Sequence, residues 1–440
     1  MKLIHVLNHF LPSQIAGTEV YVWALCKHLS TLGYQSKVII PNYENSDNET
    51  YVYDGLTVLK YAEPTVQDRA LIMGRRLPEG LDAFKQVLVT EKPDIIHFHE
   101  FSTGNGIVQK HIEVAKQTGA KVLMTFHLAG YSCRTGTLMY KSQNLCDGII
   151  NVQKCSACYL HDRGYAKLSP ILLSLSAAAA FLKMDTASWD NRIGTALATT
   201  TLLSNFQADF RRLTDQLDAL VTLTHWYKDV LLRNGVPATK ITHIPQGLPM
   251  SSKPKSPAFQ TNPVSNIRLV FIGRISAFKG LHLLIDALLE LQRDVISLDI
   301  YGQQAQTDYE QMLRQKTSTL PNVSWKGRLA QEDVVTVLSQ YDLLCLCSTF
   351  SEMSPLVIQE AFAAGIPVLA SNVYGNAEQV QHKHNGLLFT FNRVDSLKEQ
   401  LSACISHPGL LTELKNNIKV SRSFREVAAD HHTLYQSLLQ

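Results

Sequence analysis

Long apolar runs are missing from this sequence. In its 440 residues, no window holds the eighteen or so uninterrupted apolar residues of a membrane-spanning helix. The first ten residues, MKLIHVLNHF, mix a short apolar run with His and Asn, which disfavours a signal peptide. We therefore expect a cytoplasmic protein, whose contact with a membrane, if it has one, is peripheral and on the inner face.

An excess of charge of one sign is also missing. Charged residues make up 18% of the chain, and its formal net charge is +3 at pH 7. That excess is too small to indicate a nucleic-acid partner. A pI near 8.3 still permits weak attraction to an anionic membrane surface. At 440 residues the chain is too long for one hydrophobic core, so we expect two domains of roughly 200 residues each.

The stretch Ser348–Ser371, STFSEMSPLVIQEAFAAGIPVLAS, has the pattern of a phosphate site. It follows the apolar run Asp342–Cys347, which suits a strand buried on both faces of a parallel sheet. We expect Ser354 to cap a helix that begins at Pro355 and ends at Gly365. Because the free N–H groups of such a helix lie beside the carboxyl end of a strand, the stretch predicts an anion site that fits a diphosphate.

Two carboxylates lie in the same stretch, Glu352 in the loop and Glu360 in the helix, eight positions apart. A helix N-terminus that binds phosphate repels further anions, so Glu360 is better suited to accept hydrogen bonds from ribose hydroxyls. Glu352 would then lie nearer to a sugar. The alternative is a capped helix with two solvated acids.

A second strand-to-helix turn carries two cations. The apolar run Ile267–Gly273 predicts a buried strand, and it is followed by Arg274, Lys279 and a helix from Leu281. Arg offers a bidentate fork and Lys a point charge, a combination that can neutralise a diphosphate leaving group. The alternative is a loop of solvated basic residues.

Together these motifs resemble the retaining glycosyltransferases of family 4, which have the GT-B fold. The matching segments are GRISAFKG at Gly273–Gly280, the E-x7-E pattern at Glu352–Glu360, EAFAAGIPVLAS after it, and GNAEQV with NGLLF within Gly375–Phe389. The resemblance implies an α/β protein of two Rossmann-like, doubly wound domains that face each other across a cleft.

The resemblance also implies roles for individual residues. It assigns the donor diphosphate to Arg274 and Lys279, the ribose to Glu360, and the donor sugar to Glu352 and the loop after it. The donor-binding residues that we expect are Gly17, Gly273, Arg274, Lys279, Glu352, Met353, Ser354, Pro355, Leu356 and Glu360. The catalytic residues that we expect are His127, Arg274, Lys279 and Glu352, with no cofactor required for catalysis.

Two residues of this set lie in the first part of the chain. A strand at LIHVLN leads to a helix from Thr18 to about Thr31, and Gly17 between them allows close backbone approach to a donor or acceptor. The family usually has two adjacent glycines here, and Ala16 replaces the first. His127 follows the predicted strand Lys121–Phe126 and resembles the residue that contacts the donor sugar near the reacting carbon. Without the resemblance, a single His after a strand is more often structural.

His97 and His99 end the predicted strand Asp94–His99 and share one of its faces. That spacing could serve a metal ion, but histidines paired with other side chains are commoner at a strand end. We therefore expect hydrogen-bonded histidines here.

The insert from Leu128 to about Thr214 carries a group of cysteines. Cys133, Cys146, Cys155 and Cys158 fall within twenty-six residues and end in a C-x2-C knuckle. They predict a candidate structural Zn2+ site, which would hold together a loop too polar to fold alone. A disulfide framework is not expected in a reducing cytoplasm. Free buried thiols, and a redox or disulfide role, remain the alternatives.

The segment Leu168–Leu182, LSPILLSLSAAAAFL, lies between Lys167 and Lys183 and is too short to span a bilayer. One interpretation is a buried helix of the N-terminal domain. The other is a helix that lines an acceptor groove or dips into the membrane interface, close to a lipid-linked acceptor.

We expect an acceptor-side domain at residues 1–247, a linker at 248–266, a nucleotide-sugar-binding domain at 267–420 and a helix at 421–440. By resemblance, that helix would cross back to the first domain. The expected function is transfer of a sugar from a UDP- or GDP-linked donor to a saccharide or lipid-linked saccharide, in bacterial surface polysaccharide assembly. The alternatives are a catalytically silent partner that binds sugar nucleotides, or another GT-B enzyme such as an epimerase or phosphorylase.

Overall fold

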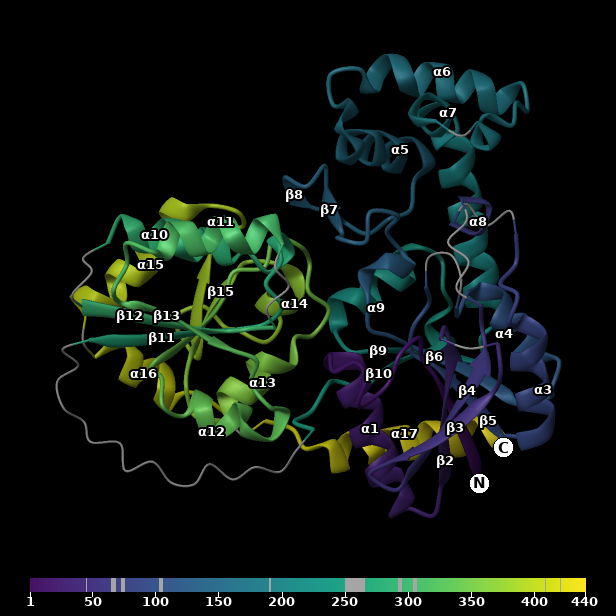
Figure 1. Cartoon of the computed structure of the whole chain (residues 1–440), viewed down its shortest axis with the longest axis horizontal. Coiled ribbons are helices and arrows are strands. Elements are labelled where there is room, and N and C mark those ends of the chain that lie inside the picture. The colour runs from purple at the N-terminus through teal and green to yellow at the C-terminus, as the bar shows by residue number, and fades with distance from the viewer. Residues whose placement is uncertain are drawn as a thin grey trace. The chain divides into compact units, whose positions relative to one another are not determined.

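The structure is a computed structural model (Figure 1) and describes residues 1–44, 46–64, 69–72, 76–102, 106–189, 191–249, 266–291, 295–303, 307–407, 409–419 and 421–440. The chain forms two compact units. Unit 1 consists of Met1–Lys141, Cys146–Pro245 and Phe424–Gln440, and unit 2 of Ser142–Leu145 and Gln246–Ser423. The predicted linker lies outside the described residues, apart from its two ends.

Unit 1 contains an eight-stranded sheet in the order β10-β9-β6-β5-β1-β2-β4-β3. Its strands are β1 Lys2–Val6, β2 Gln35–Asn42, β3 Glu49–Tyr53, β4 Leu56–Ala62, β5 Ile95–Phe98, β6 Lys121–Phe126, β9 Ala219–Thr222 and β10 Ile241–His243. Neighbours are parallel except for the antiparallel pair β3 and β4. From β1 the chain adds β2 on one side and later β5 on the other side, all in parallel. This reversal makes the carboxyl ends of β1 and β5 the topological switch point of unit 1.

Helices flank this sheet and include the last helix of the chain. They are α1 Gly17–Ser30, α2 Arg69–Ile72, α3 Leu81–Glu91, α4 Gln109–Lys116, α9 His225–Arg233 and α17 Phe424–Leu439. The α17 helix packs against α1 and buries Phe424, Val427 and Tyr435 in the same core as β1. Tyr435 also forms a hydrogen bond with the sheet, since its hydroxyl lies 2.8 Å from Nδ1 of His97 on β5. The C-terminal helix is therefore an integral part of unit 1.

Unit 2 contains a six-stranded, fully parallel sheet in the order β13-β12-β11-β14-β15-β16. Its strands are β11 Ile267–Ile272, β12 Ile296–Tyr301, β13 Val323–Gly327, β14 Leu343–Leu346, β15 Val368–Ser371 and β16 Gly386–Phe389. Its helices are α10 Leu281–Leu289, α11 Asp308–Thr317, α12 Val334–Leu338, α13 Leu356–Ala363, α14 Tyr374–Ala377, α15 Val394–Ser406 and α16 Leu410–Asn416. The order reverses between β11 and β14, so the prediction of two Rossmann-like, doubly wound sheets is confirmed.

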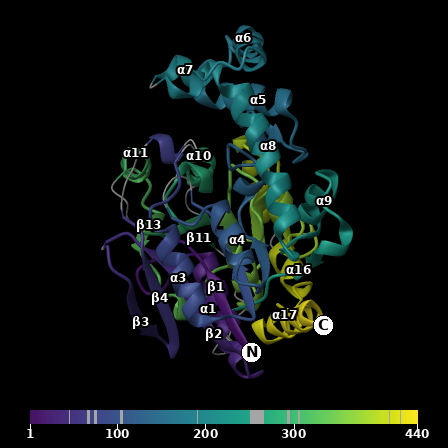
Figure 2. The ribbon, with the colours of Figure 1, turned by 90° about the vertical axis from the view of Figure 1, so that its right-hand side faces the viewer.

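Between β6 and β9 the chain forms the insert. Its elements are η1 Ala129–Tyr131, β7 Met139–Tyr140, β8 Asn144–Leu145, α5 Val152–Leu160, η2 His161–Tyr165, α6 Ser169–Phe181, η3 Thr186–Ser188, α7 Arg192–Leu197 and α8 Thr199–Gln216. Figures 1 and 2 both show α6 and α7 at the end of α8 that points away from the sheet of unit 1. The long α8 helix thus connects this outer group of helices to α4 and the sheet.

The interpretation of Leu168–Leu182 as a buried helix is wrong. The segment forms α6, but Ile171 is 62%, Leu175 51% and Phe181 86% exposed. Only small residues of the helix, Ser169, Ser176 and Ala179, are buried. The apolar composition predicted burial, whereas α6 meets α5, α7 and α8 along one narrow face only. None of the helices in the described ranges is both long and apolar enough to cross a membrane.

Candidate functional site

The switch point of unit 2 brings together the two predicted phosphate-binding turns. The turn after β11 ends in η5, Ala277–Lys279, and continues at Gly280 with a φ of +67°. A Cβ atom at Gly280 would lie 1.8 Å from the carbonyl oxygen of Cys347, so the close crossing of the two turns requires glycine. The Thr349 N–H donates a hydrogen bond of 2.8 Å to the Phe278 carbonyl, which joins the turn after β11 to the loop after β14.

Lys279 and Glu352 meet at this crossing. The Nζ atom of Lys279 lies 2.6 Å from Oε1 of Glu352, and their side chains are only 18% and 9% exposed. The Ser348 hydroxyl donates a second bond of 2.6 Å to the same carboxylate oxygen. Because a partly buried charge is costly without a partner, this ion pair fixes the position of the Lys279 ammonium group beside the loop after β14.

The start of α13 differs from the prediction. The helix begins at Leu356, and Pro355 precedes it with a ψ of 123°, outside the helical range. No side chain caps the helix, so Ser354 does not have the capping role that we expected. The sequence pattern of Ser before Pro is typical of a capped helix start, but the chain stays extended through Pro355 here. The first N–H groups of α13 therefore have no side-chain acceptor at the cap position.

Glu360 lies on α13 and is almost fully buried. Burial raises the pKa of its carboxyl group to about 7, although the hydrogen bond from Gln331 works in the opposite direction. The Gln331 Nε2 atom donates that bond over 2.5 Å. Gln331 comes from η7, Gln331–Asp333. No local sequence pattern predicts this contact, because the two residues are 29 positions apart.

The other predicted donor-binding residues of unit 2 surround these groups. Gly273 follows β11, and its carbonyl oxygen would lie 2.4 Å from a Cβ atom at Gly302. Met353 is buried in the loop after β14, where Gly375 of α14 packs so closely that a Cβ atom would lie 2.0 Å from the Glu352 carbonyl. Arg274 is exposed, and among the described residues its guanidinium group has no ion-pair partner. It is therefore free to reach a ligand.

In unit 1, His127 follows β6 and ends a buried row of rings, the histidine chain His5, His99 and His127. Nδ1 of His5 lies 2.9 Å from Nε2 of His99, and Nδ1 of His99 lies 3.1 Å from Nε2 of His127. Burial lowers the pKa of all three rings, so each is neutral and carries one N–H. Each ring therefore donates to one neighbour at most.

The direction of the histidine chain follows from its inner end. Within the described residues, the buried Nε2 atom of His5 has no hydrogen-bond partner. Because an orphaned buried N–H is rarer than an orphaned acceptor, we place the His5 proton on Nδ1, where it is donated to His99. His99 then donates from Nδ1 to Nε2 of His127. His127 is left with its proton on Nδ1, as a hydrogen-bond donor.

The structure also favours hydrogen bonds over a metal ion at this cluster. Ligand atoms of His5, His97 and His99 all lie within 4.8 Å of one another. However, the His5–His99 contact is a direct hydrogen bond, and both nitrogens of His97 are taken up by Tyr435 and Thr125. His97 and His99 lie on the same strand face, as the sequence predicted, and their rings are tilted by 33° with centroids 4.1 Å apart.

Two acidic residues near the switch point of unit 1 had no predicted role. Glu100 follows β5, and burial raises its pKa to about 7, with a further contribution from the neighbouring Glu19. Glu19 lies in the first turn of α1, two positions after Gly17, and Gly17 is exposed and begins the helix. The acidic residue two positions after Gly17, opposite the end of β5, was the signal in the sequence that could have suggested this pair.

Residues 15–171 match the family profile of "Glycosyltransferase Family 4", and residues 252–421 match that of "Glycosyl transferases group 1". The chain belongs to glycosyltransferase family 4. A solved structure of Anabaena Alr3699/HepE in complex with UDP and glucose resembles this glycosyltransferase with a TM-score of 0.62, at 16% identity over 99% of this chain and 100% of that one. This likeness supports the GT-B type of fold.

Curated relatives match shorter parts of this family 4 chain. The putative glycosyltransferase YtcC of Bacillus subtilis is 26% identical over 39% of this chain and 45% of its own length. The GDP-mannose-dependent alpha-(1-6)-phosphatidylinositol monomannoside mannosyltransferase of Mycobacterium tuberculosis is 25% identical over 44% of this chain and 54% of its own length. The chain thus spans about half the length of these curated relatives.

We predict that Glu360 makes nucleotide binding depend on pH. If its carboxylate accepts ribose hydroxyls, binding favours the ionised form, and affinity rises as pH passes upward through the pKa of about 7. Calorimetric titration with nucleoside diphosphates should therefore give a Kd that falls by about fivefold to tenfold from pH 6 to pH 8, with proton release. Glu360→Gln should remove this part of the pH dependence, and the surface control Glu290→Gln should keep it. An unchanged pH profile in Glu360→Gln would exclude the ribose role.

We also predict that His99 sets the tautomer of His127. In 15N-histidine spectra of the native protein, His127 should be neutral with its proton on Nδ1 at pH 7. In His99→Phe the bond to Nε2 is lost, so the two tautomers should mix and the 15N shifts should move toward their average. The resonance is assigned with His127→Gln. A His127 ring protonated on Nε2 in the native protein would show that the hydrogen bonds of the histidine chain run in the opposite direction.

Proposed function

We propose that this chain transfers a sugar from a UDP- or GDP-linked donor to a hydroxyl group of a saccharide or lipid-linked saccharide, with retention at the anomeric carbon. The observation that carries the proposal is the Lys279–Glu352 pair, which lies with Ser348 at the switch point of unit 2, where doubly wound sheets bind ligands. The Anabaena structure with UDP and glucose supports a nucleotide-linked sugar as the donor class. A place in bacterial surface polysaccharide assembly is part of the proposal.

In the proposed reaction, the bond between the anomeric carbon and the diphosphate breaks, and a bond to the acceptor oxygen forms on the same face of the sugar. The departing diphosphate takes the proton of the acceptor hydroxyl. Lys279, Arg274 and the first N–H groups of α13 stabilise the negative charge that develops on the diphosphate. Two cationic side chains neutralise this negative charge, so the proposed step requires no metal ion.

The remaining residues bind and orient the donor. Glu352, once a diphosphate competes for Lys279, keeps its bond from Ser348 and can accept sugar hydroxyls with its other oxygen. Glu360 accepts the ribose hydroxyls from its buried position on α13. By the family resemblance, Met353, Ser354, Pro355 and Leu356 adjoin the sugar. His127 donates its Nδ1 proton to a sugar oxygen near the reacting carbon.

A lipid-linked acceptor is supported by the surface of the insert. The exposed apolar side chains of α6 lie in the segment 166–184, which has Lys167 and Lys183 near its ends and no acidic residue. Such a surface suits the interface of a membrane with anionic headgroups. The name of the mycobacterial relative describes a phosphatidylinositol monomannoside acceptor, which fits the same class. We propose peripheral membrane contact through α6.

Lys279→Ala should lower turnover by about two to three orders of magnitude, as removal of one transition-state donor does in other enzymes. Turnover is measured as release of nucleoside diphosphate from UDP- and GDP-sugars with saccharide acceptors. The matched control is Lys398→Ala, which removes another lysine of unit 2 from an exposed ion pair with Glu290. Melting curves verify that both variants fold. Near-native turnover of Lys279→Ala would remove this residue from the mechanism, and donor binding without turnover in the native chain would favour the silent-partner alternative.

Membrane contact is tested by flotation with vesicles. The native protein should float with anionic vesicles at low salt, and an Ile171→Ser/Phe181→Ser double variant should not, because both side chains are exposed on α6. The matched control is Val52→Ser/Val89→Ser, which removes two exposed apolar side chains elsewhere in unit 1. Native protein that stays with the unbound fraction at low salt would contradict the proposed contact.

A further inference from the structure

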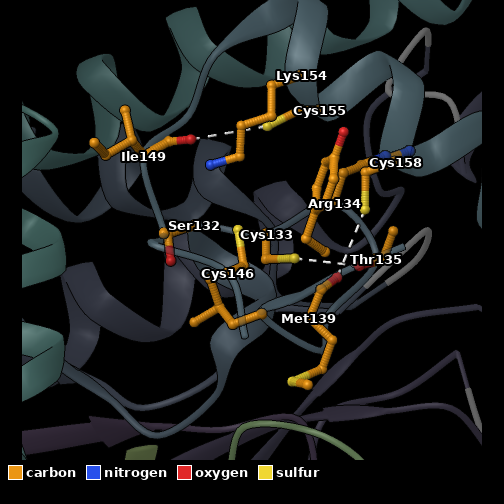
Figure 3. Close-up of a pocket in the computed structure, with 13 residues that line it drawn as sticks. Ser132, Cys133, Arg134, Thr135, Met139, Cys146, Ile149, Lys154, Cys155 and Cys158 are labelled. Atoms are coloured by element: carbon orange, nitrogen blue, oxygen red, sulfur yellow. Dashed lines mark hydrogen bonds between the residues drawn. The ribbon is translucent and has the colours of Figure 1, made fainter. Parts of the chain in front are cut away.

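The four cysteines of the insert come together from three segments of the chain. Cys133 follows η1, Cys146 follows β8, and Cys155 and Cys158 are three positions apart on α5, where they share one face. All four line a single small pocket with a cavity volume of about 30 Å³, which has room for a metal ion (Figure 3). We call it the cysteine pocket, and all four thiols are free.

The groups around the cysteine pocket suit thiolate ligands. The backbone N–H of Lys141 donates a hydrogen bond of 3.1 Å to Cys158 Sγ, the kind of contact that holds a metal-bound sulfur in position. Four thiolates around a divalent cation leave a net charge of −2, and Arg134 lines the pocket and supplies positive charge beside it. Lys154 also lines the pocket, with its ammonium group paired to Asp147.

The backbone next to the cysteine pocket is strained. The strands β7 and β8 have two residues each and form a two-stranded sheet with each other. Leu138, Lys141 and Ser142 have φ values of +49°, +55° and +55°, a region that non-glycine residues seldom adopt. Such strain persists only where the surroundings hold the chain firmly. Leu138 and Met139 are buried beside the pocket, and the Cys146 N–H donates a hydrogen bond of 3.0 Å to the Leu138 carbonyl. A metal ion that links Cys146 to α5 would add to this constraint.

We propose that Cys133, Cys146, Cys155 and Cys158 bind one structural Zn2+ ion. Four sulfur ligands in a tetrahedral arrangement are typical of zinc, with Zn–S distances near 2.3 Å. Each thiol gives up its proton as it binds, so four protons are released. The ion is structural because four protein ligands leave no open position for a substrate or water.

Closure of the site requires the side chains to turn. Among these four described residues, no three sulfur atoms lie within 4.8 Å of one another. The sulfurs instead make weak contacts, such as Cys133 with the Thr135 hydroxyl at 3.2 Å and Cys155 with the Ile149 carbonyl at 4.0 Å. A change between staggered χ1 rotamers moves a sulfur by roughly 3 Å, enough to direct it into the pocket without moving the backbone. Zinc binding exchanges these weak contacts for metal–sulfur bonds.

The experiment uses the full chain, purified with a reducing agent and without added metal. Elemental analysis should find about one zinc per chain, and the four pocket thiols should react slowly with a thiol reagent until a strong chelator is added. Chelation should lower the melting temperature, and Zn2+ should restore it. Because these measurements use the native protein, they do not depend on a variant that folds.

Variants then assign the ligands. Cys155→Ser should lose most of the zinc, whereas the control Cys404→Ser, which alters a buried cysteine in the core of unit 2, should retain it. Native protein without zinc and with four readily titrated thiols would overturn the proposal. So would disulfides among the four cysteines, or iron in place of zinc. Full zinc content in Cys155→Ser would place the metal elsewhere in the chain.

Discussion

The ion pair between Lys279 and Glu352 is the contact around which the candidate site of unit 2 is arranged. It joins the turn after β11 to the loop after β14, two segments 73 positions apart in the sequence. Parallel strands end at the same edge of the sheet, so the reversal of strand order at β11 and β14 brings the two turns close. Gly280 then permits the crossing, because any side chain there would collide with the Cys347 carbonyl. The fold thus brings together a cation from the turn after β11 and an acid from the loop after β14.

Much of this arrangement could be predicted from the sequence, and for clear physical reasons. Strands buried on both faces appear as unbroken apolar runs, so Lys121–Phe126 and the region of Leu343–Leu346 were placed within a residue or two. The helix from Leu281 was also predicted correctly, since a strand, a glycine-containing turn and a helix follow in order. The motifs near Arg274 and Glu352 identified the family, which the profile matches confirm.

The errors and omissions arose where tertiary contacts decide the outcome. The apolar sequence of α6 predicted burial, but burial depends on which elements cover a helix, and α6 is covered along one face only. Gln331 and Glu360, or His5 and His99, are partners from distant parts of the chain, and no local pattern reveals such pairs. At Pro355 the local pattern was present, but the proline precedes the helix instead of starting it.

The insert combines two properties that a small group of helices cannot easily have at once. Its outer helices expose large apolar side chains, so the hydrophobic effect gives them little help in folding. A surface that must remain apolar for a membrane or a lipid needs another source of stability. Four metal-binding thiolates at the base of α5 would supply it, since structural zinc contributes folding energy directly. The two proposals are therefore linked: a zinc ion in the cysteine pocket would provide the rigidity that the exposed face of α6 cannot obtain from a hydrophobic core.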